Sequence, residues 1–199
     1  MDALRRYALA IVFIAAAFTV AGVVWLRVPA LTSHAAFLYP VIGALLVGVL
    51  IAFEPRGVSG RASSSLLRVY AHVAAAIAGL QLFQTVVHLL IGIGVPLDML
   101  SCSAAGVGVL VTFLGTSFGK LTRNHVIGIC TRYTLASDEV WSRTHRVGGR
   151  LFVLAGLLMY VIAVFGHPAL SLIPLAAAAL VSYLYAHHIG RRHFADQGP

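Results

Sequence analysis

The sequence predicts an all-α integral membrane protein with six transmembrane helices. Sixty per cent of its 199 residues are hydrophobic and only 10% are charged, whereas about a quarter of the residues of a soluble domain are charged. The apolar residues gather in segments of about 20, the length of helix that crosses ~30 Å of hydrocarbon. These segments lack the period-two alternation of transmembrane β-strands. Helices are therefore the expected spanning elements.

Hydropathy divides the chain into six candidate spans, and we expect residues 1–199 to form a single transmembrane domain. The first span follows Arg5 and Arg6, as the apolar core of a signal peptide would. It is longer than the roughly 7–15 residues of such a core, and no small-residue cleavage site follows it, so we expect it to be retained. The predicted spans are residues 8–26, 35–53, 69–95, 99–118, 147–166 and 169–186.

The basic residues predict that both ends of the chain lie in the cytoplasm. With the N-terminus inside, Arg27 is the only one of the 14 lysines and arginines that falls in an outer segment. Cytoplasmic loops carry the excess of basic residues in membrane proteins. Because topology explains the net charge of +8, we expect no direct nucleic-acid binding.

One long polar segment, residues 119–150, is expected to form an ordered cytoplasmic loop between the fourth and fifth helices. Ser137 and the two carboxylates after it predict a helix start, since a hydroxyl caps the first turn and negative charge favours the positive end of the helix dipole. Val140, Trp141 and Thr144 follow at helical spacing. This face is predicted to lie on the membrane surface, with Trp141 at the level of the headgroups.

Two glycines, Gly148 and Gly149, follow this predicted surface helix. They would let the helix bend into the fifth span, or they would let it pack closely against a neighbour. Upstream, residues 124–134 are too polar and too irregular for a span, and we expect them to form a re-entrant or folded loop.

About 35 residues of the polar segment and the following helix form a recognisable string. It comprises Gly119-Lys120-Leu121, Asn124, Ile127-Gly128-Ile129, Thr131, Thr134-Leu135, Ser137, Glu139-Val140-Trp141, Thr144-His145-Arg146 and Gly148-Gly149-Arg150-Leu151-Phe152-Val153. With its six-span layout, the chain resembles the SdpI family of bacterial six-helix membrane proteins. Where that family usually reads Arg-Thr-Pro-Trp-Thr-Leu, this chain has Cys130-Thr131-Arg132-Tyr133-Thr134-Leu135.

The resemblance implies a non-enzymatic, multi-pass protein of the bacterial cytoplasmic (inner) membrane. The family is named for immunity proteins that protect a bacterium from its own secreted peptide toxin, and members are also linked to signalling through a membrane-held transcriptional repressor. The implied partners are the lipid bilayer, a secreted peptide toxin and a cytoplasmic transcriptional regulator. The residues implied in partner docking are Asn124, Gly128, Thr131, Thr134, Ser137, Glu139, Trp141, Thr144, His145, Arg146, Gly148 and Gly149. A structural role stays open, in which the polar side chains tie the loop to helix ends.

A polar stripe runs along the third predicted span. Gln81, Gln84, Thr85 and His88 recur at i, i+3, i+4 and i+7, which places them on one helix face. Such side chains avoid lipid, so they either bond to neighbouring helices or line a hydrophilic cavity near the outer half of the bundle. In the cavity interpretation, the secreted peptide toxin contacts the bundle near this stripe. An alternative function is a small-solute or proton-coupled transporter or channel built on the same stripe.

Nine histidines raise a haem-binding redox protein as a further alternative. Axial pairs would join His72 with His187 or His188, and His88 with His34 or His167; a zinc set would join His125, Cys130 and His145. Their spacing matches no recurrent zinc pattern, and no hydrolase, metalloprotease or phosphate-loop motif occurs. We therefore expect no enzyme activity, no cofactor and no metal. Cys102 and Cys130 fall at different depths, so no disulfide is expected.

Overall fold

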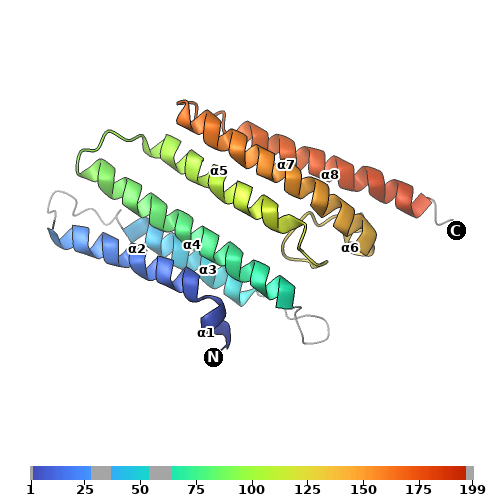
Figure 1. Cartoon of the computed structure of the whole chain (residues 1–199), viewed down its shortest axis with the longest axis horizontal. Helices are drawn as coiled ribbons and strands as arrows, with labels where there is room; N and C mark the ends of the chain where they lie inside the picture. Colours follow the sequence, from blue (N-terminus) through green and yellow to red (C-terminus); the bar gives the residue numbers. More distant parts are fainter. Residues whose placement is uncertain (1, 28–36, 54–63, 196–199) are drawn as a thin grey trace.

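The computed structural model describes residues 2–27, 37–53 and 64–195, and its regular secondary structure in these ranges is helical (Figure 1). The helices are α1 (Asp2–Arg6), α2 (Ala8–Arg27), α3 (Leu38–Ala52), α4 (Ser64–Gly92), α5 (Met99–Phe118), α6 (Arg132–Ala136), α7 (Asp138–Val164) and α8 (Leu172–Ala195). Three predicted features lie outside the described residues: the outer loop with His34, the start of the second span, and the basic residues Arg56 and Arg61.

Five of the described helices, α2, α4, α5, α7 and α8, are long and apolar enough to cross a membrane. The all-α membrane fold predicted from the sequence is thus confirmed. Helix α3 is apolar but has 15 residues, about 22 Å at 1.5 Å per residue, which is less than the thickness of the hydrocarbon core. The sixth crossing and the cytoplasmic location of both ends stay predictions.

The helix boundaries agree with the predicted spans in some places and differ in others. Helix α5 matches the predicted span at residues 99–118, and the Asp98 carboxylate caps it by accepting the N–H of Ser101 at 2.8 Å. Helix α7 begins well before the predicted residue 147, because Ser137 caps its first turn and the motif helix continues into the apolar span without a break. Helix α8 likewise continues beyond the predicted residue 186 to Ala195.

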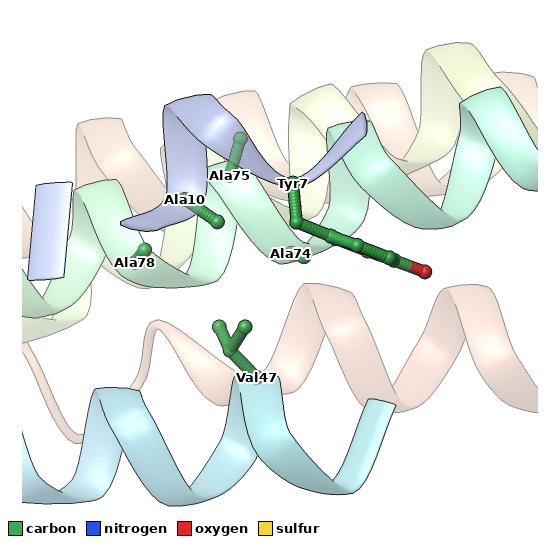
Figure 2. Packing of buried hydrophobic residues seen from close by; sticks show 6 residues of the cluster. All are labelled: Tyr7, Ala10, Val47, Ala74, Ala75 and Ala78. Atoms are coloured by element: carbon green, nitrogen blue, oxygen red, sulfur yellow. The ribbon is translucent and has the colours of Figure 1, made fainter. Parts of the chain in front are cut away.

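Successive long helices run in alternate directions and form two groups of three (Figure 1). In the first group, helices α2 and α3 pack against α4. In the second group, helices α5 and α8 pack against α7. The contact between α4 and α5 joins the two groups. The core of the first group is built around small side chains, which let the helix backbones approach closely. Its buried members are Tyr7, Ala10, Val47, Ala74, Ala75 and Ala78 (Figure 2).

The contact between α5 and α7 is the most extensive in the described chain, and glycines form it. A Cβ atom added to Gly108 would lie 2.8 Å from the carbonyl oxygen of Gly156, and one added to Gly149 would lie 2.7 Å from that of Gly115. The two antiparallel glycine pairs lie two turns apart on each helix. Of the two roles predicted for Gly149, close packing agrees with these contacts, and helix α7 continues through this position without a break.

A second apolar cluster connects the two groups of helices at the end of the bundle where the polar segment lies. Leu121 and Trp141 pack there against the first turns of α4. The buried α4 members of this cluster are Leu66, Val69, Tyr70 and Val73. The polar segment is thus attached to both groups.

Candidate functional site

The indole of Trp141 lies inside the protein, with only 2% of the residue exposed. Its Nε1–H donates to the carbonyl oxygen of Leu121 at 2.8 Å, which joins α7 to the loop after α5. Val140 and Thr144 are buried as well. The prediction that this face lies on the membrane surface is therefore wrong, because the loop and α4 cover it.

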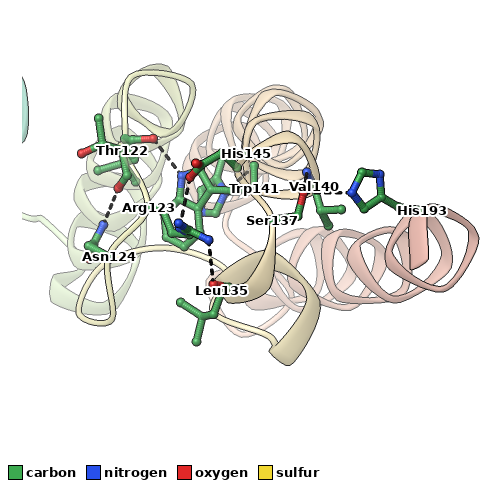
Figure 3. A network of polar contacts seen from close by, with 11 residues as sticks. Thr122, Arg123, Asn124, Leu135, Ser137, Val140, Trp141, His145 and His193 are labelled. Carbon is green, nitrogen blue, oxygen red and sulfur yellow. Dashed lines mark hydrogen bonds and ion pairs between the residues drawn. The ribbon is translucent and has the colours of Figure 1, made fainter. Parts of the chain in front are cut away.

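His145 connects α7 to the middle of the loop (Figure 3). Its ring stacks on Trp141 with the centroids 4.0 Å apart, and the residue is 1% exposed. Its Nδ1 lies 2.9 Å from the carbonyl oxygen of Trp141, and its Nε2 accepts the N–H of Ile129 at 2.9 Å. A carbonyl only accepts and an amide N–H only donates, so these two bonds require the neutral imidazole with its proton on Nδ1.

The carboxamide of Asn124 holds the first turn of the loop. Its Oδ1 accepts the N–H groups of Val126 and Ile127 at 2.9 and 2.8 Å. Its Nδ2 donates to the carbonyl oxygens of Thr122 and Ile127 at 2.9 and 3.1 Å. Both donors and both lone pairs of the amide are thus used in supporting the loop.

Gly128 is required for the loop to reach His145. Its φ of +128° is one that L side chains rarely adopt. A Cβ atom at this position would also collide with His145 Nε2. The glycine therefore allows the close approach in which the next residue donates its N–H to the imidazole.

Two threonines start the short helix α6 in a reciprocal capping arrangement. Thr131 Oγ1 accepts the N–H of Thr134 at 3.2 Å, while Thr134 Oγ1 accepts the N–H of Thr131 at 2.8 Å. The Thr134 side chain is fully buried, and its hydroxyl also lies 2.8 Å from the carbonyl oxygen of Ile129. Both threonines are thus held by local structure.

Two of the positions at which the chain departs from the usual SdpI pattern, 130 and 133, contact neighbouring elements. The Cys130 thiol donates to the carbonyl oxygen of Asn124 at 3.6 Å, and partial burial raises the pKa of this thiol. The Tyr133 ring covers Gly190 of α8 and meets the ring of His187 edge-on at 5.1 Å. A tyrosine at 133 therefore serves to join α6 to α8.

The region built by these contacts coincides with a match to known proteins. Residues 120–186 match the SdpI/YfhL protein family. The match falls on the part of the chain that carries the motif, and it confirms the resemblance predicted there. The chain is also 28% identical over 103 residues to the protein named Immunity protein SdpI of Bacillus subtilis (strain 168). The alignment covers 50% of each sequence, so the match spans about half the length of this curated relative. No solved structure matches the chain.

The SdpI-family region presents a charged outer face. Arg143 pairs with Glu139 one turn earlier at 2.6 Å, and their side chains are 58% and 52% exposed. Arg123 pairs with Asp138 at 3.0 Å. His193 lies 3.1 Å from the Ser137 hydroxyl. Among the residues predicted for docking, Gly128, Glu139 and Arg146 are exposed, and Thr131 and Ser137 are partly exposed. The others are buried: Asn124, Thr134, Trp141, Thr144, His145, Gly148 and Gly149.

Ser182 of α8, a buried residue beside Gly148, was not identified by sequence reasoning. Gly148 lies against the side chains of Ile129 and Ser182, so that a Cβ atom would lie 2.7 Å from Ile129 Cδ1. The hydroxyls of Thr144 and Ser182 are buried without a hydrogen-bond partner among the described residues. The signal that could have identified these positions is the run of small residues at a helical contact.

The predicted polar stripe on α4 faces α3. Thr85 is fully buried and donates to the carbonyl oxygen of Gln81 at 2.8 Å. The stem of Gln81 packs against Gly43 of α3. The ring of His88 lies 5.9 Å from that of Tyr39, and Gln84 is half-buried.

The cavity beside α4 is apolar rather than hydrophilic. It has a volume of about 580 Å³ and is lined by side chains of α2, α4, α5 and α7, such as Phe13, Leu80, Phe113 and Tyr160. None of the four stripe residues lines it. Stripe and cavity are therefore separate features of α4.

The predicted zinc set can be compared with the structure. Within residues 2–27, 37–53 and 64–195, no three His, Cys, Asp or Glu side chains are grouped in a way that could hold a metal ion. Both ring nitrogens of His145 are occupied by backbone groups. The zinc set that would join it to His125 and Cys130 is not assembled.

Proposed function

We propose that this protein is an SdpI-like immunity protein of the bacterial cytoplasmic membrane, which protects the cell against a secreted, membrane-active peptide toxin. The observation that supports this proposal is the coincidence of two features. The residues that match the SdpI/YfhL family form the folded loop, α6, α7 and most of α8. The motif is thus one closed unit rather than an unstructured connection.

The outer face of this unit is the surface that would dock a cytoplasmic regulator. Most of the motif is engaged in holding the fold, so contact falls to its exposed members. Glu139 and Arg143 are the best placed, because both side chains extend from the first turns of α7. An exposed ion pair contributes only about 0–1 kcal/mol to stability, so its groups can exchange partners at small cost.

The path from the membrane to this face follows two rigid connections. Helix α7 runs without interruption from Asp138 to Val164, so a displacement of its apolar part moves Glu139 as well. Helix α4, which bears the polar stripe, packs through its first turns against Trp141. In the proposed mechanism the toxin meets the bundle near the stripe, and the resulting helix shift changes how the face around Glu139 is presented.

A survival assay tests the proposal. A toxin-sensitive bacterium would express the parent chain, the Asn124→Asp variant or the matched variant His125→Ala, with membrane levels checked in each strain. A carboxylate at 124 would place an oxygen against two carbonyl groups and open the loop. The side chain of the neighbouring His125 is exposed, so its removal should leave the loop closed. We expect the parent and His125→Ala to survive higher toxin concentrations than the empty vector, and Asn124→Asp to lose the protection. No protection by the parent at normal membrane levels would refute the immunity function.

A further inference from the structure

A hollow of about 360 Å³ lies between α5 and α7 next to the polar segment. Its walls include Gly115, Gly119 and Gly149, with the side chains of Arg146 and Arg150 at its edge. The glycines remove the side chains that would otherwise fill the space between the helices. The stem of Arg146 passes close to Gly119, whose added Cβ would lie 3.9 Å from Arg146 Cγ.

The hollow carries an excess of positive charge. Arg146 and Arg150 are one turn apart on the same face of α7, and both are exposed. In the described part of the chain neither guanidinium has a carboxylate partner; the Nε of Arg146 donates only to a backbone carbonyl, that of Ser142, at 3.4 Å. The two acidic residues of α7 are paired with Arg123 and Arg143 instead.

The position of the hollow along the helices matches the level of lipid headgroups. Helix α7 becomes apolar from Leu151 onward, and α5 is apolar up to Phe118, where the polar segment begins. The two arginines therefore stand at the boundary between the apolar and the polar part of the bundle. Thr116 and Val153 extend the hollow toward the apolar side. Basic side chains at this level attract the phosphate groups of anionic lipids.

We propose that this hollow binds one anionic phospholipid, with its phosphate between Arg146 and Arg150. Each guanidinium offers a planar fork of N–H donors that fits two phosphate oxygens. The glycines leave room for the headgroup, and Val153 provides an apolar surface for the start of an acyl chain. This site shares Arg146 with the predicted docking residues but includes neither Glu139 nor Arg143, and it does not depend on the immunity function.

The first test compares lipid preference in the purified full-length protein. Native mass spectrometry would measure binding of phosphatidylglycerol and of phosphatidylcholine to the parent, to Arg146→Gln/Arg150→Gln and to the control Arg191→Gln/Arg192→Gln, which removes the same charge at the end of α8. An arginine near the surface contributes roughly five-fold to the preference for an anionic lipid. We expect the first pair of substitutions to abolish most of the preference and the control to retain it.

A second pair of variants leaves both arginines in place. Gly119 has φ −67°, and its added Cβ would make only an ordinary contact, so a side chain fits there. Gly119→Glu would place a carboxylate beside Arg146, whereas Gly119→Gln has the same size without the charge. We expect Gly119→Glu to lose the phosphatidylglycerol preference and Gly119→Gln to keep it. Equal preference in both variants would overturn the proposal.

Inorganic phosphate distinguishes the two possible sources of the phosphate group. If the site belongs to a lipid, millimolar inorganic phosphate should leave bound phosphatidylglycerol in place, because it lacks the acyl chains. Displacement of the lipid by phosphate alone would show that the hollow takes the free anion, and it would overturn the assignment to a lipid.

Discussion

The imidazole Nε2 of His145 accepts the backbone N–H of Ile129 at 2.9 Å, and this bond joins the loop to helix α7. The other ring nitrogen, Nδ1, bonds to the carbonyl oxygen of Trp141, so the orientation of the ring is fixed. Gly128 permits the approach by having no side chain. Three residues of the SdpI motif thus act together as one structural joint, which explains their spacing in the sequence.

His145→Ala should destabilise the protein. The substitution leaves the N–H of Ile129 without its acceptor in a partly buried position, which costs up to roughly 1–3 kcal/mol. Unfolding in mixed micelles would measure the loss against His188→Ala, an exposed histidine of α8. An equal stability of the two variants would contradict the role given to the joint.

Cys130 should report whether the loop is closed. In a Cys102→Ser background, partial burial of the thiol raises the pKa of Cys130, an exposed residue, so less thiolate is present at neutral pH than for an ordinary cysteine and alkylation should be slower. The rate should increase as the pH rises toward that raised pKa. His145→Ala should open the loop, return the pKa toward its ordinary value and accelerate alkylation at fixed pH. A maleimide titration with pH measures both effects, and identical profiles would exclude opening of the loop.

The glycine pairs between α5 and α7 should not tolerate side chains. A Cβ on Gly156 would collide with the Thr112 hydroxyl and with the backbone of α5. We expect Gly156→Ala to lower the free energy of unfolding by about 1–3 kcal/mol, as other overpacked sites do. Gly48→Ala is the matched control, since nothing lies within 4 Å of its added Cβ. A neutral effect of Gly156→Ala in the same unfolding assay would show that the helices are farther apart.

Gly190→Ala should separate α6 from α8. The added methyl group would occupy the place of the Tyr133 side chain. Tyr133 would have to move, and the backbone of α6 would become more accessible to proteases and to hydrogen exchange. Hydrogen exchange of residues 132–136 would measure this. Unchanged protection would indicate that Tyr133 does not hold α6 in place.

Local signals in the sequence predicted part of this structure correctly. The span at residues 99–118 follows from hydropathy. The helix start at Ser137 follows from its hydroxyl and the acidic residues after it. The spacing of Gln81 to His88 placed them on one face of α4, and whether this stripe contacts a peptide stays a prediction.

The burial of Trp141 and His145 could not be predicted in this way. Leu121 and the first turns of α4 cover Trp141, while Phe118 and the loop at Ile129 contact His145, and all of these are distant from α7 in the sequence. Hydropathy alone therefore assigned an amphipathic surface helix to a segment that the loop covers. The glycine pairs were visible as residues 108, 115, 149 and 156, spaced by two turns in each helix. Pairing them required the antiparallel register of α5 and α7.

The docking role of the Glu139–Arg143 face is tested most directly by exchanging its two charges. In Glu139→Arg/Arg143→Glu the ion pair can still form, so fold and membrane level should be retained, while the pattern of charge offered to a partner is reversed. The measurement is the toxin concentration that halves survival of cells expressing this variant or the parent. We predict that the exchanged variant falls to the level of the empty vector. Protection equal to that of the parent would show that the charges of these two residues are not recognised by a partner, and it would contradict a contact at this face.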